Sequence, residues 1–374
     1  MTRLRVLIVS HLALPHVGGV ENLLDLEIRG LVQAGHQVTL LTSDGRGDGR
    51  EPRYSAQVQM IRIPAWHWLE RRFGVPYPLF SPTIVTTLWH LIAEHDIVHA
   101  HGFLFQNTAI AVWLAKLQNK DCLLTDHGGI QQFGSKLVTF LARLGVETVG
   151  RLSCLCATRV VTYNSRIQQQ LDRLGRRRDT EFLANPVDHM LFQPPTQAER
   201  EAARHRLGWD VSRKKVLFVG RLLPTKGASL LLGCGDWHYD LVFCGPGDVS
   251  KLGPQPLSDV EFLPPRPQAD LVELYHAADV LVLPTGVREG FPLVVQEALM
   301  CGLPVVLGDD PGFEPYRNLP GLTFCERTQG SVKAAIVAAL TNGRVEDAAR
   351  VHKLFLPLDA WIRRLFPLPD GTTP

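Results

Sequence analysis

The sequence is poor in cysteine, shows no strong excess of either charge and contains no long hydrophobic run, and each shortage argues against a class of protein. Its seven cysteines are an odd number in 374 residues, and the spacing of Cys154 and Cys156 suits neither a zinc site nor a CxxC redox motif. Reduced thiols in a cytoplasmic protein fit this composition best. The 39 basic and 37 acidic residues leave a formal net charge of +2, which is too small to indicate a nucleic-acid partner.

A membrane-spanning segment is also missing from the sequence. No stretch approaches the roughly 18 uninterrupted apolar residues that a transmembrane helix needs, so any membrane contact would be peripheral. The apolar run at residues 6–9 is short and is soon followed by His11, and we interpret it as a first β-strand rather than as part of a signal peptide. A hydrophobic content of 45% suits a globular protein with two domains of ordinary size.

Apolar, β-rich runs alternate with helical segments in two successive blocks, which predicts an α/β protein with two Rossmann-like domains and parallel sheets. Between the blocks lies Asn185-Pro186-Val187-Asp188, followed by the polar, proline-containing stretch 193–197, which is the natural hinge. We expect domains over residues 1–190 and 191–352, followed by a terminal segment, 353–374, with an amphipathic helix at 358–366. The predicted strands are residues 6–9, 38–41, 97–100, 122–125 and 159–163 in the first block, and 216–219, 241–244, 280–283 and 304–307 in the second.

Two carboxylates flank a predicted loop and helix in the second block. The strand at 280–283 is followed by Glu289, then by Pro292 where a first helical residue should stand, then by Glu297, with Gly302 after the last turn. Such a loop lies at the carboxyl ends of the strands, where ligands bind, and the helix N-terminus attracts anions. A sugar nucleotide, which carries both phosphates and hydroxyls, fits these groups, although solvated carboxylates at a helix end are the alternative.

A pair of cations follows the first strand of the second block. Arg221 ends the segment Phe218-Val219-Gly220-Arg221, and Lys226 comes five residues later, before Gly227. A guanidinium and an ammonium at the carboxyl edge of a strand form a pocket for a diphosphate leaving group, and two such cations can replace a divalent metal. Either cation alone is more often a surface charge.

Glycines and histidines mark the same edge of the first block. Gly18 and Gly19 follow the first strand and open a helix, where they allow a ligand to approach the backbone, although a tight turn is the more common reason for an isolated pair. The full G-x-G-x-x-G of a dinucleotide fold is missing here, which weakens a dehydrogenase interpretation. His101 and His127 each follow a predicted strand, a place where a lone histidine is more often structural than catalytic.

Taken together, these motifs resemble retaining glycosyltransferases of family 4. Glu289 and Glu297 are separated by seven residues, as in the Glu-X7-Glu element of that family, and Gly-Arg-x-x-x-x-Lys-Gly is similar to its pyrophosphate-binding element. The resemblance covers nearly the whole chain, in the right order. It implies a GT-B fold, with two Rossmann-like domains facing a central cleft and a C-terminal helix that crosses back to the first domain. The first domain would bind the acceptor and the second the nucleotide sugar.

The resemblance also implies a reaction and a role for each residue. The chain would move a hexosyl unit from a UDP- or GDP-linked sugar to a hydroxyl of a glycan or lipid-linked glycan, with retention and without a metal or other cofactor. Arg221 and Lys226 would stabilise the diphosphate, Glu289 would hold the donor sugar, Glu297 would bind the ribose and His127 would position the sugar. The remaining donor-side residues would be Gly18, Gly19, Gly290, Phe291, Pro292 and Leu293, and the cleft residues His101, Asn164 and Asn185.

Two other functions and one possible membrane contact remain open at this point. A sugar-nucleotide epimerase would need an acid/base set that we cannot assemble, and a non-catalytic glycan- or nucleotide-binding protein would be expected to lack Glu289, Arg221 or Lys226, which are all present. The segment 65–80 mixes aromatic residues with arginines and could touch an anionic membrane on its cytoplasmic face, although a local aromatic core explains it as well.

Overall fold

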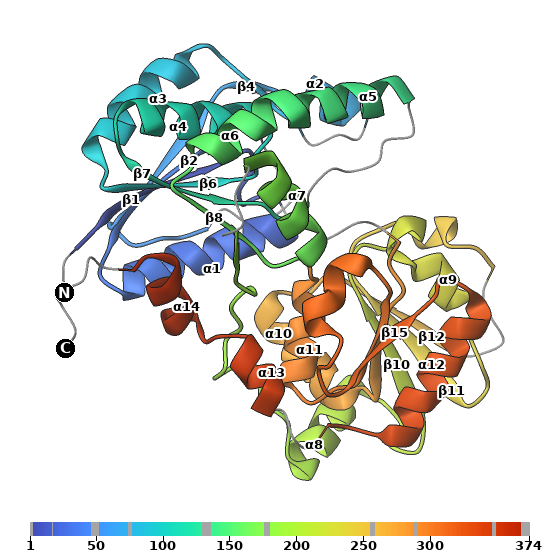
Figure 1. The fold of residues 1–374 in the computed structure, drawn as a ribbon. Helices are drawn as coiled ribbons and strands as arrows, with labels where there is room; N and C mark the ends of the chain where they lie inside the picture. The colour runs from blue at the N-terminus through green and yellow to red at the C-terminus, as the bar shows by residue number, and fades with distance from the viewer. Residues whose placement is uncertain are drawn as a thin grey trace. The chain divides into compact units, whose positions relative to one another are not determined.

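The computed structural model describes residues 3–16, 18–45, 52–73, 77–128, 136–175, 180–254, 259–286, 290–345 and 349–367. The chain forms two compact units, one of residues 1–185 with 358–374 and one of residues 186–357, and each contains a parallel sheet with helices (Figure 1). The predicted α/β class with two Rossmann-like domains is therefore confirmed. Among the described helices, none combines the length and the apolar character that crossing a bilayer requires.

The first unit is built on a sheet in the order β3-β2-β1-β6-β7-β8-β9, with parallel pairing throughout, plus a small antiparallel pair β4-β5. Its strands are β1 (Arg5–Ser10), β2 (Gln37–Ser43), β3 (Val58–Ile63), β4 (Ala65–Trp66), β5 (Leu79–Phe80), β6 (Ile97–His101), β7 (Asp121–Thr125), β8 (Arg159–Thr162) and β9 (Glu181–Phe182). Its helices are α1 (Gly19–Gln33), α2 (Trp68–Phe73), α3 (Thr83–Glu94), α4 (Gln106–Leu117), α5 (Lys136–Gly145), the π-helical η1 (Val146–Gly150), α6 (Arg151–Cys156), α7 (Ser165–Gly175) and α14 (Leu358–Leu365).

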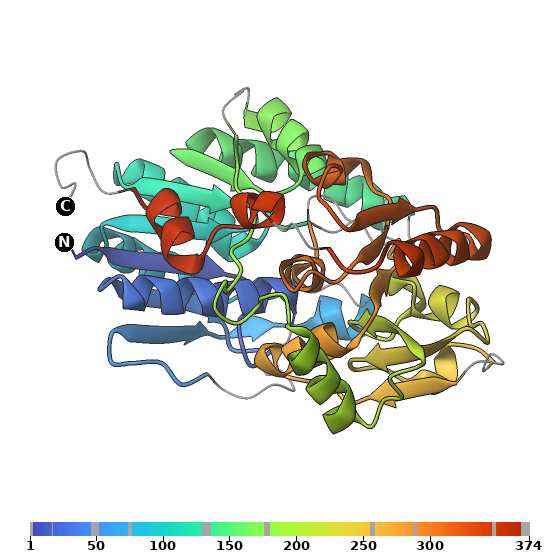
Figure 2. The same ribbon diagram turned by 90° about the horizontal axis from the view of Figure 1, so that it is seen from below.

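Helices pack on this sheet through apolar faces that the sequence makes visible. In α1 the side chains of Leu24, Ile28 and Leu31 are buried, and Gly35 with a φ of +88° follows the helix end. The C-terminal α14 lies beside α1, where Ile362 packs against Gly30 (Figure 2). The prediction that the terminal helix returns to the first domain is confirmed.

The second unit has the sheet order β12-β11-β10-β13-β14-β15, also parallel throughout. Its strands are β10 (Lys214–Val219), β11 (Tyr239–Cys244), β12 (Val260–Leu263), β13 (Val280–Leu283), β14 (Val305–Gly308) and β15 (Leu322–Cys325). Its helices are α8 (Gln197–Leu207), α9 (Ala228–Leu232), α10 (Gln268–Ala277), α11 (Leu293–Met300), α12 (Gln329–Asn342) and α13 (Ala349–Leu354), with short 3-10 turns η2 (Pro224–Lys226), η3 (Val249–Lys251) and η4 (Pro311–Tyr316).

The order of the strands determines where a ligand can bind in each unit. In the first sheet the chain reverses its direction of growth between β1 and β6, and in the second between β10 and β13. Open parallel sheets bind ligands outside the carboxyl ends of the strands at such a switch point. In the second unit this place belongs to the loops that begin at Gly220 and Pro284, and in the first unit to the segments after Ser10 and His101.

Candidate active site

The loop after β10 carries the two predicted phosphate-binding cations. Arg221 is exposed and Lys226 is half-buried at the end of η2. The backbone N–H of Gly220 donates to Cys244 O at 3.0 Å, and that of Leu222 donates to Pro246 O at 2.8 Å, so the loop is fixed to the end of β11. Both cations thus lie on a loop at the carboxyl edge of the second sheet, as the sequence predicts.

Gly227 lets this loop meet the segment that follows β13. Its φ is +88°, and a Cβ atom at this position would lie 2.4 Å from the carbonyl oxygen of Pro284. The backbone N–H of Gly286 in turn donates to Thr225 O at 3.0 Å. The cation-bearing loop and the start of the loop leading to Gly290 are therefore joined at the switch point. The helix α9 that follows is short and has five residues.

The two-glutamate element is described from Gly290 onward, and Glu289 lies outside the described residues. Gly290 is buried, and the ring of Phe291 is 3% exposed and stacks on Tyr316 at a centroid distance of 3.7 Å. Pro292 is extended, with a ψ of 130°, and occupies the N-cap of α11, so the helix begins at Leu293 and not at Pro292 as predicted. The free N–H groups at the start of the helix therefore begin one residue later than predicted, at Leu293.

Glu297 is a buried member of α11 rather than a solvated one. It is 3% exposed, Gln268 Nε2 donates to one of its carboxylate oxygens at 2.6 Å, and the Tyr275 hydroxyl donates to the other at 2.8 Å. Burial raises the pKa of the Glu297 carboxyl above its usual range. Both oxygens thus already have a protein partner, and a ribose contact would add to or replace one of these bonds.

In the first unit, Gly18 leaves space for a carboxylate at the start of α1. A Cβ atom on Gly18 would lie 2.3 Å from Glu21 Oε2, although the backbone itself is extended, while Gly19 begins the helix with no atom within 4 Å of its own Cβ position. Glu21 Oε1 lies 2.8 Å from His16 Nδ1, and this hydrogen bond raises the pKa of His16. The glycine pair therefore places a carboxylate and an imidazole beside the first turn of the helix.

The two predicted histidines of the first unit contact each other directly. His101 Nδ1 lies 2.9 Å from His127 Nε2, and His127 Nδ1 lies 3.0 Å from the Tyr163 hydroxyl. His101 is 1% exposed and His127 is 9% exposed. Burial lowers the pKa of His127 well below its ordinary value, so its imidazole is neutral at pH 7. Both ring nitrogens of His127 therefore have a protein partner.

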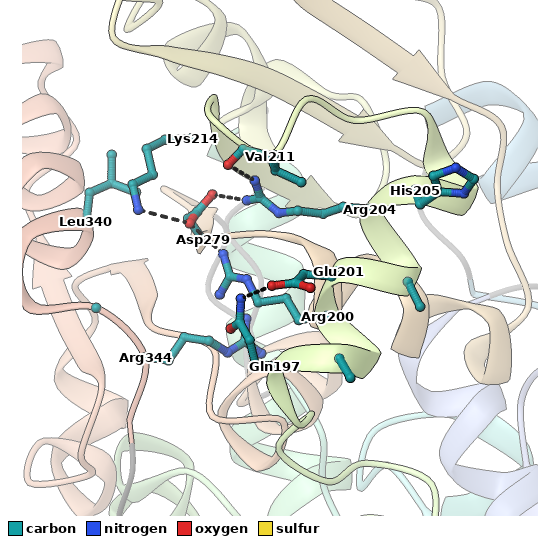
Figure 3. Close-up of a pocket in the computed structure, with 13 residues that line it drawn as sticks. Gln197, Arg200, Glu201, Arg204, His205, Val211, Lys214, Asp279, Leu340 and Arg344 are labelled. Atoms are coloured by element: carbon teal, nitrogen blue, oxygen red, sulfur yellow. Dashed lines mark hydrogen bonds and ion pairs between the residues drawn. The ribbon is translucent and has the colours of Figure 1, made fainter.

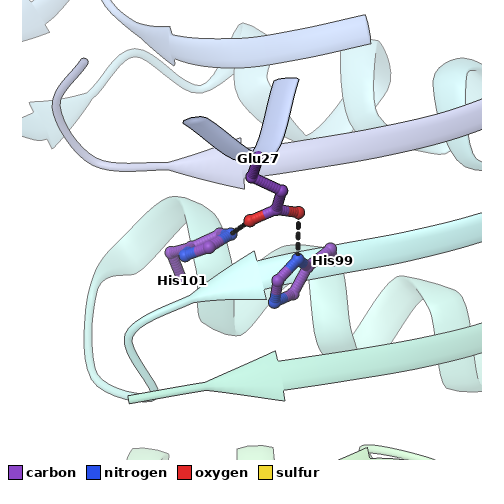
Figure 4. A group of neighbouring side chains, drawn as sticks. All are labelled: Glu27, His99 and His101. Carbon is purple, nitrogen blue, oxygen red and sulfur yellow. Dashed lines mark hydrogen bonds and ion pairs between the residues drawn. The ribbon is translucent and has the colours of Figure 1, made fainter. Parts of the chain in front are cut away.

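Behind these histidines lies a group that the sequence analysis missed. Glu27 of α1 lies between the imidazoles of His99 and His101, with Oε1 2.6 Å from His99 Nδ1 and Oε2 3.2 Å from His101 Nε2 (Figure 4). His99 Nε2 continues the chain to the Thr125 hydroxyl at 2.8 Å. The visible signal was the pair His99 and His101, which share one face of a strand, together with a charged residue in the apolar stripe of a helix.

The two predicted asparagines are both buried in the first unit. Asn164 Oδ1 accepts the backbone N–H groups of Arg166 and Ile167, so this side chain caps the N-terminus of α7. Asn185 is 3% exposed and is the last residue of the first unit before the chain enters the second. A cap bond of this kind accounts for Asn164 without a ligand.

An open depression of about 840 Å³ in the second unit is rich in arginine but lies at the wrong edge for the predicted nucleotide site (Figure 3). Lys214 begins β10 and Asp279 directly precedes β13, so the depression adjoins the amino ends of the strands. Arg204 Nε donates to Ala277 O at 2.8 Å, and Arg344 Nη1 donates to Ala278 O at 2.9 Å. These arginines donate to backbone carbonyl groups, and Arg204 also forms an ion pair with Asp279, so their role is structural.

Comparison with known proteins agrees with this architecture. Residues 199–343 match the family described as Glycosyl transferases group 1, and residues 17–190 match the family described as Glycosyltransferase Family 4. The GDP-mannose-dependent alpha-mannosyltransferase of Mycobacterium tuberculosis (strain CDC 1551 / Oshkosh) is 30% identical over 326 residues, which cover 83% of this chain and 81% of that protein. The D-inositol 3-phosphate glycosyltransferase of Mycobacterium sp. (strain KMS) is 39% identical over 124 residues, but these cover only 30% of this chain and 28% of that relative.

Solved structures show the same fold. The crystal structure of HepE from Anabaena in complex with UDP superimposes with a TM-score of 0.71 at 17% identity, covering 96% of this chain and 98% of that chain. Fold and sequence matches together define a glycosyltransferase with the GT-B architecture. The chain belongs to glycosyltransferase family 4, as its two-glutamate and Gly-Arg-x-x-x-x-Lys-Gly motifs predict.

Proposed function

We propose that the chain transfers a hexosyl unit, with retention of configuration, from a GDP- or UDP-linked sugar to a hydroxyl of a glycan or lipid-linked glycan, and that it needs no metal. The observation that carries this proposal is the loop after β10, which holds Arg221 and Lys226 at the switch point of the second sheet. Two cations on this loop would neutralise a departing diphosphate. The name of the mannosyltransferase relative, which aligns over most of the chain, makes GDP-mannose the first donor to test.

The remaining roles follow from the family motifs. Glu289 would hold donor hydroxyls and support positive charge at the anomeric carbon, Glu297 would bind the ribose, and His127 would position the sugar. Acceptor hydroxyls would be bound by the first unit, near Gly18 and near His101, which contacts His127. No side chain of the described residues is an obvious covalent nucleophile, which suits a mechanism in which the leaving phosphate helps to deprotonate the acceptor.

Binding and turnover with Lys226→Ala test the proposal. GDP, UDP and their sugars should each be screened for thermal stabilisation in chelator, where a ligand at 100 times its Kd adds about 2.7 kcal/mol. We expect one nucleotide to stabilise the wild-type protein, and Lys226→Ala to lower turnover by about 10²–10³-fold, because the lost ammonium stabilises developing negative charge.

The matched control for this experiment is Lys251→Ala, a change of an exposed lysine in the same unit. Its turnover should stay within twofold of the wild type. Near-normal turnover of Lys226→Ala, or activity that disappears in chelator and returns with a divalent metal, would contradict the assignment of the diphosphate to these cations.

A peripheral membrane contact is a second part of the proposal. Trp66 and Trp68 expose 71% and 53% of their surfaces, and Arg71 and Arg72 follow in the short helix α2. Exposed indoles followed in the sequence by two arginines suit the interface of an anionic bilayer, where a lipid-linked acceptor on the cytoplasmic face could be reached. We expect replacement of both arginines by Gln to weaken cosedimentation with phosphatidylserine vesicles severalfold, and an unchanged bound fraction would argue against the contact.

A further inference from the structure

A buried chain of polar side chains connects α1 to His127, the residue that would position the sugar. It runs from Glu27 through His101 to His127 and ends at Tyr163, and the contacts measure 3.2 Å, 2.9 Å and 3.0 Å. Glu27 is fully buried, although the same helix exposes Arg29, two residues further on, to solvent. A charged residue in such a place is costly unless it has a specific partner, and the partners here are two imidazoles.

The carboxylate determines which nitrogens carry hydrogen. A carboxylate can only accept, so His99 Nδ1 and His101 Nε2 must both be N–H groups when Glu27 is ionised. Burial alone would raise the pKa of Glu27, but the imidazoles of His99 and His101 outweigh it and lower this pKa to about 2. Glu27 Oε2 and His101 Nε2 lie within ion-pair distance at 3.2 Å, but their geometry is not that of a hydrogen bond, and within the described residues neither atom has a hydrogen-bond partner.

We infer that Glu27 is a positioning residue for the proposed sugar transfer, because it fixes the ring of His101 and, through it, the orientation and protonation pattern of His127. Pairs of carboxylate and histidine orient imidazoles in this manner in many catalytic and metal sites. The inference rests on the proposed function for its role in turnover, but the link between the two side chains stands on the contacts alone.

Several other ionisable groups face this chain and belong to the same electrostatic environment. His11 after β1 and His99 act on His127, and Arg159 of β8 acts on His99. Burial lowers the pKa of His11 to about 3 and that of His99 to about 4, so neither imidazole competes for the carboxylate as a cation at pH 7. Glu27 is therefore the negative charge that the histidines of this cluster contact.

Three candidate donor atoms close together could also bind a metal ion, since Glu27, His99 and His101 offer ligand atoms within 4.8 Å of one another. The 2.6 Å separation between His99 Nδ1 and Glu27 Oε1 is that of a direct hydrogen bond. Zinc ligands stand about 2.0–2.1 Å from the ion and spread around it in a tetrahedron. The contacts therefore favour a chain of direct contacts between side chains, with a hydrogen bond from Glu27 to His99 and an ion-pair contact from Glu27 to His101.

Nitrogen NMR on the intact protein tests the link without reference to activity. In [15N]histidine-labelled wild type, with signals assigned from single His→Gln variants, we expect protons on His101 Nε2 and His99 Nδ1 and a changed nitrogen pattern at His127 in Glu27→Gln. A wild-type His101 with an unprotonated Nε2, or a His127 pattern that is identical in the variant, would overturn the inference. One equivalent of tightly held zinc in the purified wild type would also overturn it.

Kinetics then test the role in transfer. Glu27→Gln should lower kcat by about 10- to 100-fold, the size of effect that outer-shell partners of an imidazole have, while the KM for the donor stays within twofold. Glu27→Asp, which keeps the carboxylate, should recover part of the lost turnover. An unchanged kcat in Glu27→Gln would remove the positioning role.

The control is His95→Gln. His95 is also buried, and it forms hydrogen bonds with Thr39 Oγ1 and Leu91 O. It lies before the amino end of β6, however, whereas His101 is at the carboxyl end of this strand. This variant should leave the nitrogen pattern of His127 and kcat unchanged, and a drop in kcat equal to that of Glu27→Gln would reduce the effect to a loss of packing. If the wild type transfers no sugar at all, the proposed function fails, whereas the nitrogen measurements still decide the link.

Discussion

At the scale of single residues, Asp279 shows how one buried carboxylate organises the second unit. It is 7% exposed, Arg200 donates to it at 2.7 Å, the backbone N–H of Lys215 donates at 2.8 Å, and Arg204 forms a further ion pair. Removing one partner of a buried ion network typically costs roughly 3–5 kcal/mol, because the remaining charges stay buried without compensation. We expect Asp279→Asn to lower the free energy of unfolding by an amount in this range, measured by urea denaturation.

The dependence on pH follows from the direction of the pKa shift. Burial would raise the pKa of Asp279, but the Lys215 N–H and the arginine charges outweigh it and lower this pKa below 3.8. A carboxyl group with a lowered folded-state pKa stabilises the protein above its unfolded pKa, and this stabilisation is lost as the pH falls through the folded pKa. The difference between wild type and Asp279→Asn should therefore be full at pH 7 and shrink below pH of about 4.

Asp309→Asn is the matched control in the same unit. Asp309 also pairs with an arginine, Arg317 at 2.7 Å, but the two side chains are 45% and 35% exposed. Exposed pairs contribute only about 0–1 kcal/mol. A loss of stability as large as that of Asp279→Asn would show that burial does not decide the effect.

Single residues also show the limit of what the sequence predicts about the site. Arg221, Lys226 and His127 belong to local motifs that follow strands, so their placement at strand ends could be predicted. Glu27 and His99 are 72 positions apart and meet only because α1 packs on the face of β6. No local pattern contains that information, and neither does the engagement of both Glu297 oxygens by residues of α10.

At the scale of elements, the strands that the sequence predicts are the inner ones. Every strand inside the two described sheets appears among the predicted runs, whereas β3, β9, β12 and β15 do not, and these are the four edges. Inner parallel strands are buried on both faces and give continuous apolar runs, which are easy to recognise. Edge strands are partly exposed and carry polar residues, as in Val58–Ile63, where Gln59 and Arg62 stand among apolar side chains. An edge strand forms by pairing with the neighbouring inner strand, and the local sequence does not contain this information.

Helix boundaries illustrate the same dependence on context. The sequence predicts Pro292 as a first helical residue because its φ suits a helix, but φ does not fix ψ, and the extended ψ of 130° makes Pro292 the cap of α11. Gly302, with a φ of +67°, follows this helix as expected. Glycine with a positive φ is a stronger local signal than proline here, because fewer residues can replace it.

At the scale of the whole molecule, the chain crosses between its two units at residues 185–186 and again at 357–358, and the family match in the second unit lies within residues 199–343. If nucleotide binds to the loops after β10 and β13, it should stabilise those loops of the second unit and leave the sheet of the first unit as it was. Binding protects an amide against hydrogen exchange only where it suppresses the opening of that segment.

Hydrogen exchange of the full chain with saturating GDP or UDP, in chelator, measures this distribution. We expect slower exchange by about tenfold or more in the segments 220–227 and 284–286, since a tenfold change corresponds to about 1.4 kcal/mol of local stabilisation. Arg221→Ala at the same nucleotide concentration should lose most of this protection, while amides of β1 and β6 exchange equally in both proteins. Protection confined to the first unit, with none in the segments 220–227 and 284–286, would instead place the nucleotide on the half of the molecule that we assign to the acceptor, and would contradict the proposed assignment of donor and acceptor to the two units.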